Sequence, residues 1–270
     1  MSVLYAIVMG IVQGVTEYLP VSSTGHLAIV NLLFNKQVNG NDPFIIWLHG
    51  ATLVALLIYF WRDIFDLLWS WAPRHRHDRA PQRRICVFIV IVSLVTGVMG
   101  VIYKLANLPD GSFLVLGLGY VATTVALVLA EYLGTRAARR PIDKLGAVRS
   151  LGIGFAQGLG IIASISRSGV TIAAGLFSGL DREQATRFSF LAGIPAIAAA
   201  FLLDVVGLHT LPANWNWTGA LVSFVLAAVV AYLSIAFLLA LVKRVKLYGF
   251  AVYTGFLAIV LLVLALVVKP

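Results

Sequence analysis

The sequence contains few charged residues. Only 11% of its 270 residues are Asp, Glu, Lys or Arg, whereas soluble globular domains average about 25%. Hydrophobic residues make up 60% of the chain, and the mean hydropathy is +0.96. The single cysteine, Cys86, excludes an internal disulfide and a cysteine metal site. These scarcities exclude a soluble fold and indicate a membrane protein, whose length suits about six spans.

Six apolar runs are long enough to cross a hydrocarbon core of about 30 Å. We therefore predict an all-α polytopic membrane protein with six transmembrane helices. The predicted spans are Phe44–Trp61, Ile85–Tyr103, Phe113–Leu133, Phe188–Val206, Thr218–Val242 and Gly249–Val268.

Two further apolar runs are too short to span. As helices, Leu4–Leu19 and Leu151–Ala163 would be only about 24 and 20 Å long at about 1.5 Å per residue. Each is followed by a polar cluster and then by a second short apolar run. This pattern predicts two re-entrant helical hairpins, which membranes tolerate where protein or a cavity satisfies the backbone.

The chain also contains an internal repeat. The segment Gly10-Ile-Val-Gln-Gly matches Gly154-Phe-Ala-Gln-Gly at an offset of 144 residues, and the same offset places Ser22 on Ser166 and Gly25 on Gly169. Each copy holds one hairpin and three spans, and an odd number of spans inverts the second copy. We predict one membrane domain over residues 1–270, with inverted repeats at about 1–133 and 150–270 joined by a basic cytoplasmic loop at 134–149.

The 20 Lys and Arg residues outnumber the 11 Asp and Glu residues and give a formal net charge of +9. With six spans and two returning hairpins, nearly all of these basic residues fall on one side of the membrane. The positive-inside rule makes that side cytoplasmic. The net charge therefore reflects topology and anionic headgroups, and no nucleic-acid partner is expected.

The two polar clusters contain side chains that are unusual inside a membrane. Inverted repeats with broken helices place a site near the midplane, where half-helix N-termini can bind anions. We expect the N–H groups of Gly25 and Gly169 to be free to bind phosphate there. Intramembrane ionisable groups are functional candidates by default, although a structural Glu17–Arg167 pair and helix-capping hydroxyls are alternatives. The candidates are Glu17, His26 and Arg167, with the hydroxyls of Ser22, Ser23, Thr24, Ser166, Ser168 and Thr171.

These clusters resemble the motifs of a known family, the undecaprenyl pyrophosphate phosphatases, which are integral-membrane enzymes associated with bacitracin resistance. The run Gln13-Gly-Val-Thr-Glu-Tyr-Leu-Pro-Val-Ser-Ser-Thr-Gly-His26 is similar to the family's first motif. Ser166-Arg-Ser-Gly-Val-Thr171 resembles the core of the second, and Phe188–Pro195 the segment after it. The family usually has Pro-Gly before this core, whereas Ala163-Ser164 stands there in this chain.

The resemblance implies hydrolysis of undecaprenyl diphosphate to the monophosphate carrier and phosphate. It places this reaction on the outer face of the bacterial cytoplasmic membrane, where it recycles the carrier for cell-wall synthesis. We expect Arg167 to bind phosphate oxygens and Ser23 to be the nucleophile, with His26 exchanging its proton and Glu17 orienting His26. In an alternative assignment His26 is the nucleophile. Substrate contacts are expected from Gln13, Ser22, Thr24 and Gly25 in the first cluster and from Ser166, Ser168, Gly169 and Thr171 in the second.

A divalent cation, Mg²⁺ or Ca²⁺, is also implied by the resemblance. The core offers one carboxylate, Glu17, because Gln13 stands where Glu is common. Any cation is therefore expected to depend on substrate phosphates.

Access and neighbouring polar groups give three further expectations. We expect packing or a hydrogen bond, rather than catalysis, for His49. Since a polyprenyl chain stays in the bilayer, we expect a lateral apolar opening that leads to Ser23. A flippase or transporter of phosphorylated polyprenyl lipid is the alternative function.

Overall fold

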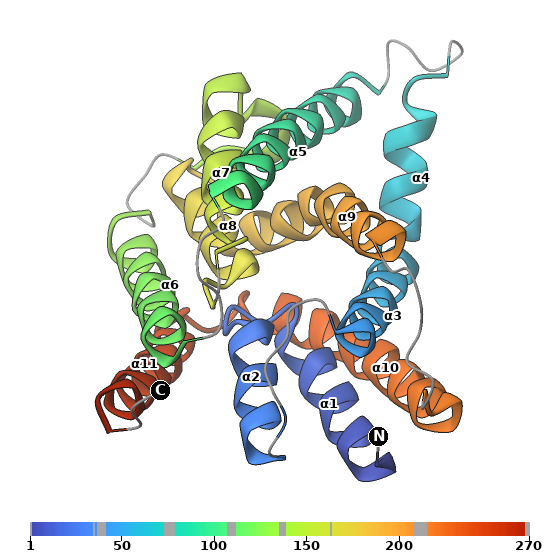
Figure 1. The fold of residues 1–270 in the computed structure, drawn as a ribbon. Helices are drawn as coiled ribbons and strands as arrows, with labels where there is room; N and C mark the ends of the chain where they lie inside the picture. Colours follow the sequence, from blue (N-terminus) through green and yellow to red (C-terminus); the bar gives the residue numbers. More distant parts are fainter. Residues whose placement is uncertain are drawn as a thin grey trace.

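The computed structural model describes residues 2–34, 36, 42–72, 79–106, 112–134, 139–162, 164–207 and 215–267. Residues 73–78 and 135–138 of the two basic loops, Ala163 and Val268 lie outside this description. Within the described ranges all regular elements are helical (Figure 1). They are α1 (Val3–Thr16), α2 (Ser23–Leu33), α3 (Pro43–Tyr59), α4 (Trp61–Trp69), α5 (Ala80–Ala106), α6 (Phe113–Leu133), η3 (Ile142–Lys144), α7 (Ala147–Leu159), α8 (Arg167–Phe177), α9 (Arg182–Gly207), α10 (Trp217–Leu241) and α11 (Tyr248–Val267).

The long helices confirm the all-α polytopic prediction. In the described part of the chain, α5, α6, α9, α10 and α11 are each long and apolar enough to cross a membrane. The helices α3 and α4 together pass the same test but are bent by 66°, so the number of spans is five, or six with this pair as one. Large apolar side chains such as Leu94 and Leu105 are exposed, as expected for a surface that faces lipid.

Two helical hairpins occupy the positions that the short apolar runs predict. The first, α1 and α2, lies in the lower part of Figure 1, and the second, α7 and α8, lies in the upper part. The 14 residues of α1 and the 13 of α7 give lengths of about 21 and 20 Å. The helix α1 ends at Thr16, three residues before the predicted limit, and Pro20 disfavours helical backbone at Leu19.

The first arms of the two hairpins, α1 and α7, pack in the same way. Glycines on the first arm of each hairpin bring its backbone against a long helix from the other half of the chain, as small residues do in membrane proteins. A Cβ on Gly14 of α1 would lie 2.7 Å from the Ala227 carbonyl oxygen of α10, and one on Gly158 of α7 would lie 2.6 Å from Met99 Cβ of α5. Gly10 and Gly154, one turn earlier, are equally close to these partner helices.

An ion pair with a buried carboxylate connects the end of α6 with the start of α9 and with the residue before α11. The Glu131 carboxylate of α6 accepts two hydrogen bonds from the Arg182 guanidinium at 2.6 and 2.7 Å, and a third from the backbone N–H of Leu247 at 2.9 Å. A carboxylate held by a two-pronged arginine contact and a backbone donor is well compensated for its burial. This acid therefore has a structural role, outside the polar clusters of the hairpins.

Candidate active site

Glu17 lies at the centre of the polar site, just after α1 ends. Its Oε2 accepts hydrogen bonds from Ser23 Oγ at 2.7 Å and from Gln13 Nε2 at 3.0 Å, and its Oε1 lies 3.4 Å from Arg167 Nη2. The carboxylate side chain is only 7% exposed. One carboxylate thus joins the first hairpin to the second, and the structure brings Ser23 and Arg167 to the same group.

The first turn of α2 presents Ser23 to this carboxylate. Ser22 caps the helix with a positive φ of 66°, and its Oγ accepts a hydrogen bond from the Gly25 N–H at 3.4 Å. The sharp reversal at Ser22 turns the chain back on itself, so that Ser23 faces Glu17. The next residue, Thr24, is exposed on α2.

The second hairpin presents Arg167 in an equivalent way. Ser166 caps α8 and accepts a hydrogen bond from the Gly169 N–H at 3.1 Å. The N–H groups of Gly25 and Gly169 therefore donate to the serine caps. This differs from the prediction that these two groups are free to bind phosphate. Ser168 Oγ donates to the Leu19 carbonyl at 3.0 Å and so links the tips of the two hairpins. Thr171 Oγ1 donates to the Arg167 carbonyl at 2.6 Å.

One nitrogen of the Arg167 guanidinium is available to donate a hydrogen bond to a ligand. Its Nη1 is buried and has no hydrogen-bond partner in the described residues. The same nitrogen lies so close to Gly193 of α9 that a Cβ there would overlap it. A buried donor without an acceptor is costly, and an anionic oxygen placed beside Glu17 and Ser23 would satisfy it.

His26 has different partners from those predicted. Its Nδ1 lies 2.7 Å from the Ser22 carbonyl, and its Nε2 lies 2.7 Å from the Tyr253 hydroxyl of α11. The Tyr120 hydroxyl of α6 lies 3.0 Å from Nδ1. Among the described residues no hydrogen bond joins His26 to Ser23 or to Glu17; the carboxylate takes the place beside the serine that the sequence analysis gives to the histidine.

His49, for which the sequence predicts packing or a hydrogen bond, lies beside the polar site. Its Nδ1 lies 3.0 Å from the Ile45 carbonyl of the same helix, which agrees with a hydrogen-bonding role. However, its Nε2 lies 3.8 Å from Glu17 Oε2. The rule that ionisable groups inside a membrane are functional by default applies to His49 as well, and it was the signal available in the sequence.

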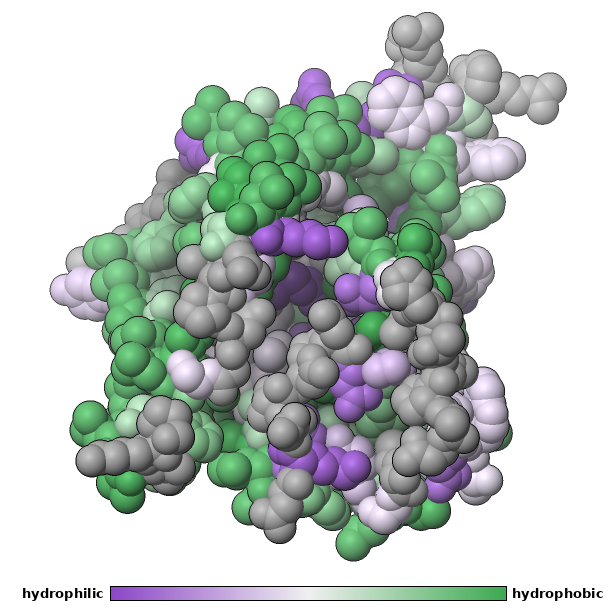
Figure 2. Space-filling model, in the orientation of Figure 1, coloured by the Kyte–Doolittle hydropathy of each residue, from purple (hydrophilic) through white to green (hydrophobic). Residues whose placement is uncertain are grey.

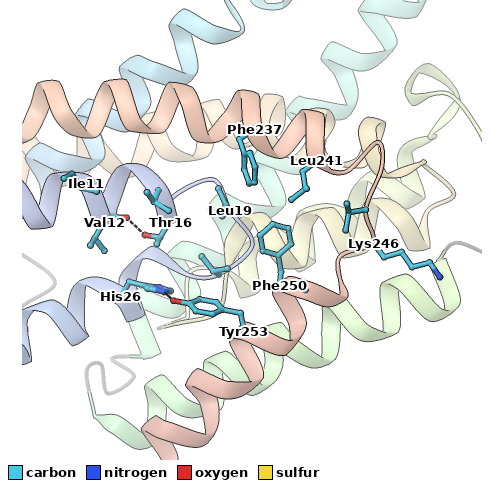
Figure 3. Close-up of a pocket in the computed structure, with 14 residues that line it drawn as sticks. Ile11, Val12, Thr16, Leu19, His26, Phe237, Leu241, Lys246, Phe250 and Tyr253 are labelled. Carbon is cyan, nitrogen blue, oxygen red and sulfur yellow. Dashed lines mark hydrogen bonds between the residues drawn. The ribbon is translucent and has the colours of Figure 1, made fainter.

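An apolar groove of about 550 Å³ has His26 in its wall. Figure 3 shows His26 and Tyr253 next to each other along the lower side of the groove, with Ile11 and Val12 at one end and Lys246 at the other. Ser23 is not part of the lining, so the groove reaches the histidine rather than the predicted serine. On the face drawn in Figure 2, hydrophilic residues surround a central hollow, and the flanks are largely apolar. The groove is lined by Ile11, Val12, Val15, Leu19, Phe237, Leu241 and Phe250, among others.

Comparison with known proteins identifies the family of this chain. Residues 6–260 match the family described as bacitracin resistance protein BacA. The chain belongs to the BacA family. An undecaprenyl-diphosphatase of Treponema denticola is 38% identical over 257 residues, which cover 94% of each protein. Those of Moorella thermoacetica and Korarchaeum cryptofilum are 36% and 33% identical, covering 95% and 97% of this chain and 94% and 99% of the relatives.

The donor set of this BacA chain fits a divalent cation that is shared with a phosphate ligand. No group of three or more His, Cys, Asp or Glu side chains that could hold a metal ion occurs in the described residues. The Gln13 Nε2 donates to Glu17 Oε2, and the Oε1 of the same amide is buried without a hydrogen-bond partner among the described residues. Carboxylate and amide oxygens are ligands of Mg²⁺ and Ca²⁺, and phosphates and water complete many such sites.

Proposed function

We propose that this chain hydrolyses undecaprenyl diphosphate to undecaprenyl phosphate and phosphate, and so recycles the lipid carrier for cell-wall synthesis. The observation that carries the proposal is the convergence of Ser23 Oγ and the Arg167 guanidinium on Glu17. A nucleophile, a base and a guanidinium that can bind phosphate oxygens thus lie together in one largely buried site. The relatives' name, undecaprenyl-diphosphatase, supports the choice of substrate.

In the first step Ser23 attacks the terminal phosphorus. Glu17 Oε2, 2.7 Å from Ser23 Oγ, accepts the serine proton as the Oγ–P bond forms. The bond between this phosphorus and the bridging oxygen breaks, and undecaprenyl phosphate leaves. Because a phosphate monoester has a second pKa near 6, this leaving group needs no strong acid. His26, which is bound to Ser22 and Tyr253, is therefore not required beside the serine.

In the second step water hydrolyses the phosphoserine. Water attacks phosphorus, the Oγ–P bond breaks, and Glu17 returns its proton to Ser23 Oγ. Both protons of the water leave with the phosphate, as H₂PO₄⁻. Arg167 binds the phosphate oxygens in both steps, and a planar guanidinium suits the charge that they carry in the transition state.

A divalent cation would be held by Glu17 and Gln13 together with substrate phosphates. When bound, it would neutralise phosphate charge and polarise the P–O bonds. The support for this part of the proposal is the unpartnered Gln13 Oε1 beside the single carboxylate.

We also propose an inverted repeat in the inner membrane of a bacterium, with the basic face cytoplasmic and the site open to the outer face. The equivalent serine caps of α2 and α8 and the equivalent glycine contacts of α1 and α7 support the repeat. The distribution of Lys and Arg supports the orientation.

The test is phosphate release by the purified protein supplied with a long-chain polyprenyl diphosphate, over a range of Mg²⁺ and Ca²⁺ concentrations. We expect turnover with release of one phosphate per lipid. Lipid binding without phosphate release at any cation concentration would contradict the proposal and favour a lipid transporter.

A further inference from the structure

Tyr253 makes an interaction that the mechanism above does not use. It lies on α11, and its hydroxyl is 2.7 Å from His26 Nε2. The two rings are stacked, with centroids 5.6 Å apart and planes 17° apart. The ring of Tyr253 also forms part of the wall of the apolar groove (Figure 3). One side chain therefore contacts both the apolar groove and the polar cluster.

The hydrogen bonds of His26 define its protonation pattern. The Ser22 carbonyl can only accept, so His26 Nδ1, at 2.7 Å from it, must carry the hydrogen. In the neutral ring Nε2 is then an acceptor, and the Tyr253 hydroxyl must donate to it. Tyr120 fits the same scheme, because its hydroxyl donates to the Ser22 carbonyl at 3.4 Å.

This chain of contacts ends at the proposed nucleophile. The backbone hydrogen bond from the His26 N–H to the Ser22 carbonyl is long, at 3.4 Å, and the short contact from His26 Nδ1 takes up the same oxygen. That oxygen belongs to the residue with positive φ that turns Ser23 toward Glu17. A positive φ is strained in a residue other than glycine, and it persists where the surrounding structure fixes it.

We propose that Tyr253 is a positioning residue of this site, whose hydroxyl donates to Nε2 and so holds the orientation of the His26 ring and stabilises the Nδ1-protonated form that the Ser22 carbonyl selects. Through the Ser22 carbonyl, the ring then stabilises the turn that holds Ser23 on Glu17. The inference rests on the proposed function, because it assigns a role in the same reaction. It differs from a packing role, in which the phenol ring alone would matter.

The test compares Tyr253→Phe with Tyr232→Phe. Tyr232 of α10 is a matched control, since it is 41% exposed against 43% for Tyr253, and its ring packs on Tyr59. We expect Tyr253→Phe to lower kcat about tenfold, the ratio that corresponds to about 1.4 kcal/mol, with KM within about twofold. Tyr232→Phe should leave both constants unchanged.

A second measurement does not depend on activity. In protein labelled with ¹⁵N-histidine, the His26 signals are identified by their loss in His26→Gln. The wild type should show one tautomer, with the proton on Nδ1, and Tyr253→Phe should shift the Nε2 signal toward an exchanging mixture. Tyr232→Phe should not change these signals.

Two results would overturn the inference. One is an unchanged His26 spectrum in Tyr253→Phe, whether or not kcat falls, because the ring would then act by packing alone. The other is an altered spectrum with a wild-type kcat. A wild-type protein that releases no phosphate contradicts the proposed function instead, and in that case the spectrum alone decides whether Tyr253 sets the form of His26.

Discussion

The two hairpins share a backbone plan and differ in chemistry. Both have a Gln and a Gly on the first arm and a serine cap on the second, at the same offset of 144 residues. Along this offset, however, Ser23 of the first copy corresponds to Arg167 of the second, Glu17 to Ile161, and His49 to Gly193. In the proposed mechanism the first copy thus supplies the nucleophile and its base, and the second supplies the arginine that binds phosphate.

This difference explains how two similar hairpins can form one asymmetric site. The long Arg167 side chain fits because Gly193, where the first copy has His49, leaves room for its guanidinium. Ile161 leaves the second copy without a carboxylate, so Arg167 reaches across to Glu17 at 3.4 Å. Small residues in one copy therefore make space for charged side chains that act on the other.

Removing the nucleophile should break the comparison most strongly. We expect Ser23→Ala to lower kcat on the order of 10⁴-fold or more, with lipid binding largely retained, because a hydroxyl adds little ground-state affinity beside an arginine. The matched control in the second hairpin is Ser168→Ala, which loses the hydrogen bonds to the Leu19 carbonyl and to Ser166 Oγ but removes no group that contacts Glu17. Phosphate release and lipid binding in detergent measure both variants; near-wild-type turnover in Ser23→Ala would move the assignment to His26 or to water.

Removing the positive charge of Arg167 should have the next largest effect. Arg167→Ala is expected to lower kcat on the order of 10³-fold and to weaken lipid binding as well, because the charge is compensated in both ground and transition states. Arg167→Lys should restore little, since an ammonium lacks the planar fork. Full activity in Arg167→Lys, measured by the same assay, would show that a point charge is sufficient.

A single methyl group at Gly193 tests the space that Arg167 needs. A Cβ there would displace the guanidinium, and a shift of about 1 Å in a catalytic group can cost about 100-fold. We expect Gly193→Ala to lower kcat/KM by about that factor without unfolding the protein, because the end of a long side chain can move. The control is Gly152→Ala, where a Cβ meets no other atom within 4 Å. Equal activity of the two variants would refute this role for Gly193.

As alternatives to substrate binding and catalysis, the sequence offers helix-capping serines and a Glu17–Arg167 pair, and the structure contains both contacts. Ser22 and Ser166 cap α2 and α8 because a serine before a short helix bonds an N–H of its first turn in any context. The Glu17–Arg167 contact follows from the cost of leaving either charge alone in a membrane. Both expectations need only neighbouring residues or a general solvation argument.

The features that could not be predicted from the sequence depend on long-range packing. Tyr253 lies 227 residues from His26 along the chain, and a tyrosine within an apolar run also fits packing or an interfacial position. The expected Ser23–His26 pair rests on helical spacing, but the Ser22 carbonyl offers the ring a closer partner at 2.7 Å. His49 approaches Glu17 only because α3 packs beside the end of α1, which spacing in the sequence does not reveal.

The Gln13 and Gln157 pair provides the finest test of the difference between the copies. Both side chains are fully buried, but Gln13 Nε2 donates to a carboxylate, whereas Gln157 Nε2 donates to Thr96 Oγ1 at 3.1 Å and to the Ala192 carbonyl at 3.4 Å. A carboxylate at position 13 would face Glu17, and two such groups favour a proton or a cation between them. One at position 157 would face a carbonyl oxygen and could not share a cation with a second acid.

We therefore expect Gln13→Glu to lower the Mg²⁺ concentration for half-maximal phosphate release by about tenfold, equivalent to about 1.4 kcal/mol of added attraction, and to lose activity when chelator is present. Gln157→Glu should leave the Mg²⁺ dependence unchanged and lower the melting temperature, because it buries an uncompensated charge. The measurement is a Mg²⁺ titration of both variants and the wild type. An identical titration curve for Gln13→Glu and the wild type would exclude Gln13 and Glu17 as the cation site, because a second carboxylate at a true site must strengthen binding of a hard divalent ion.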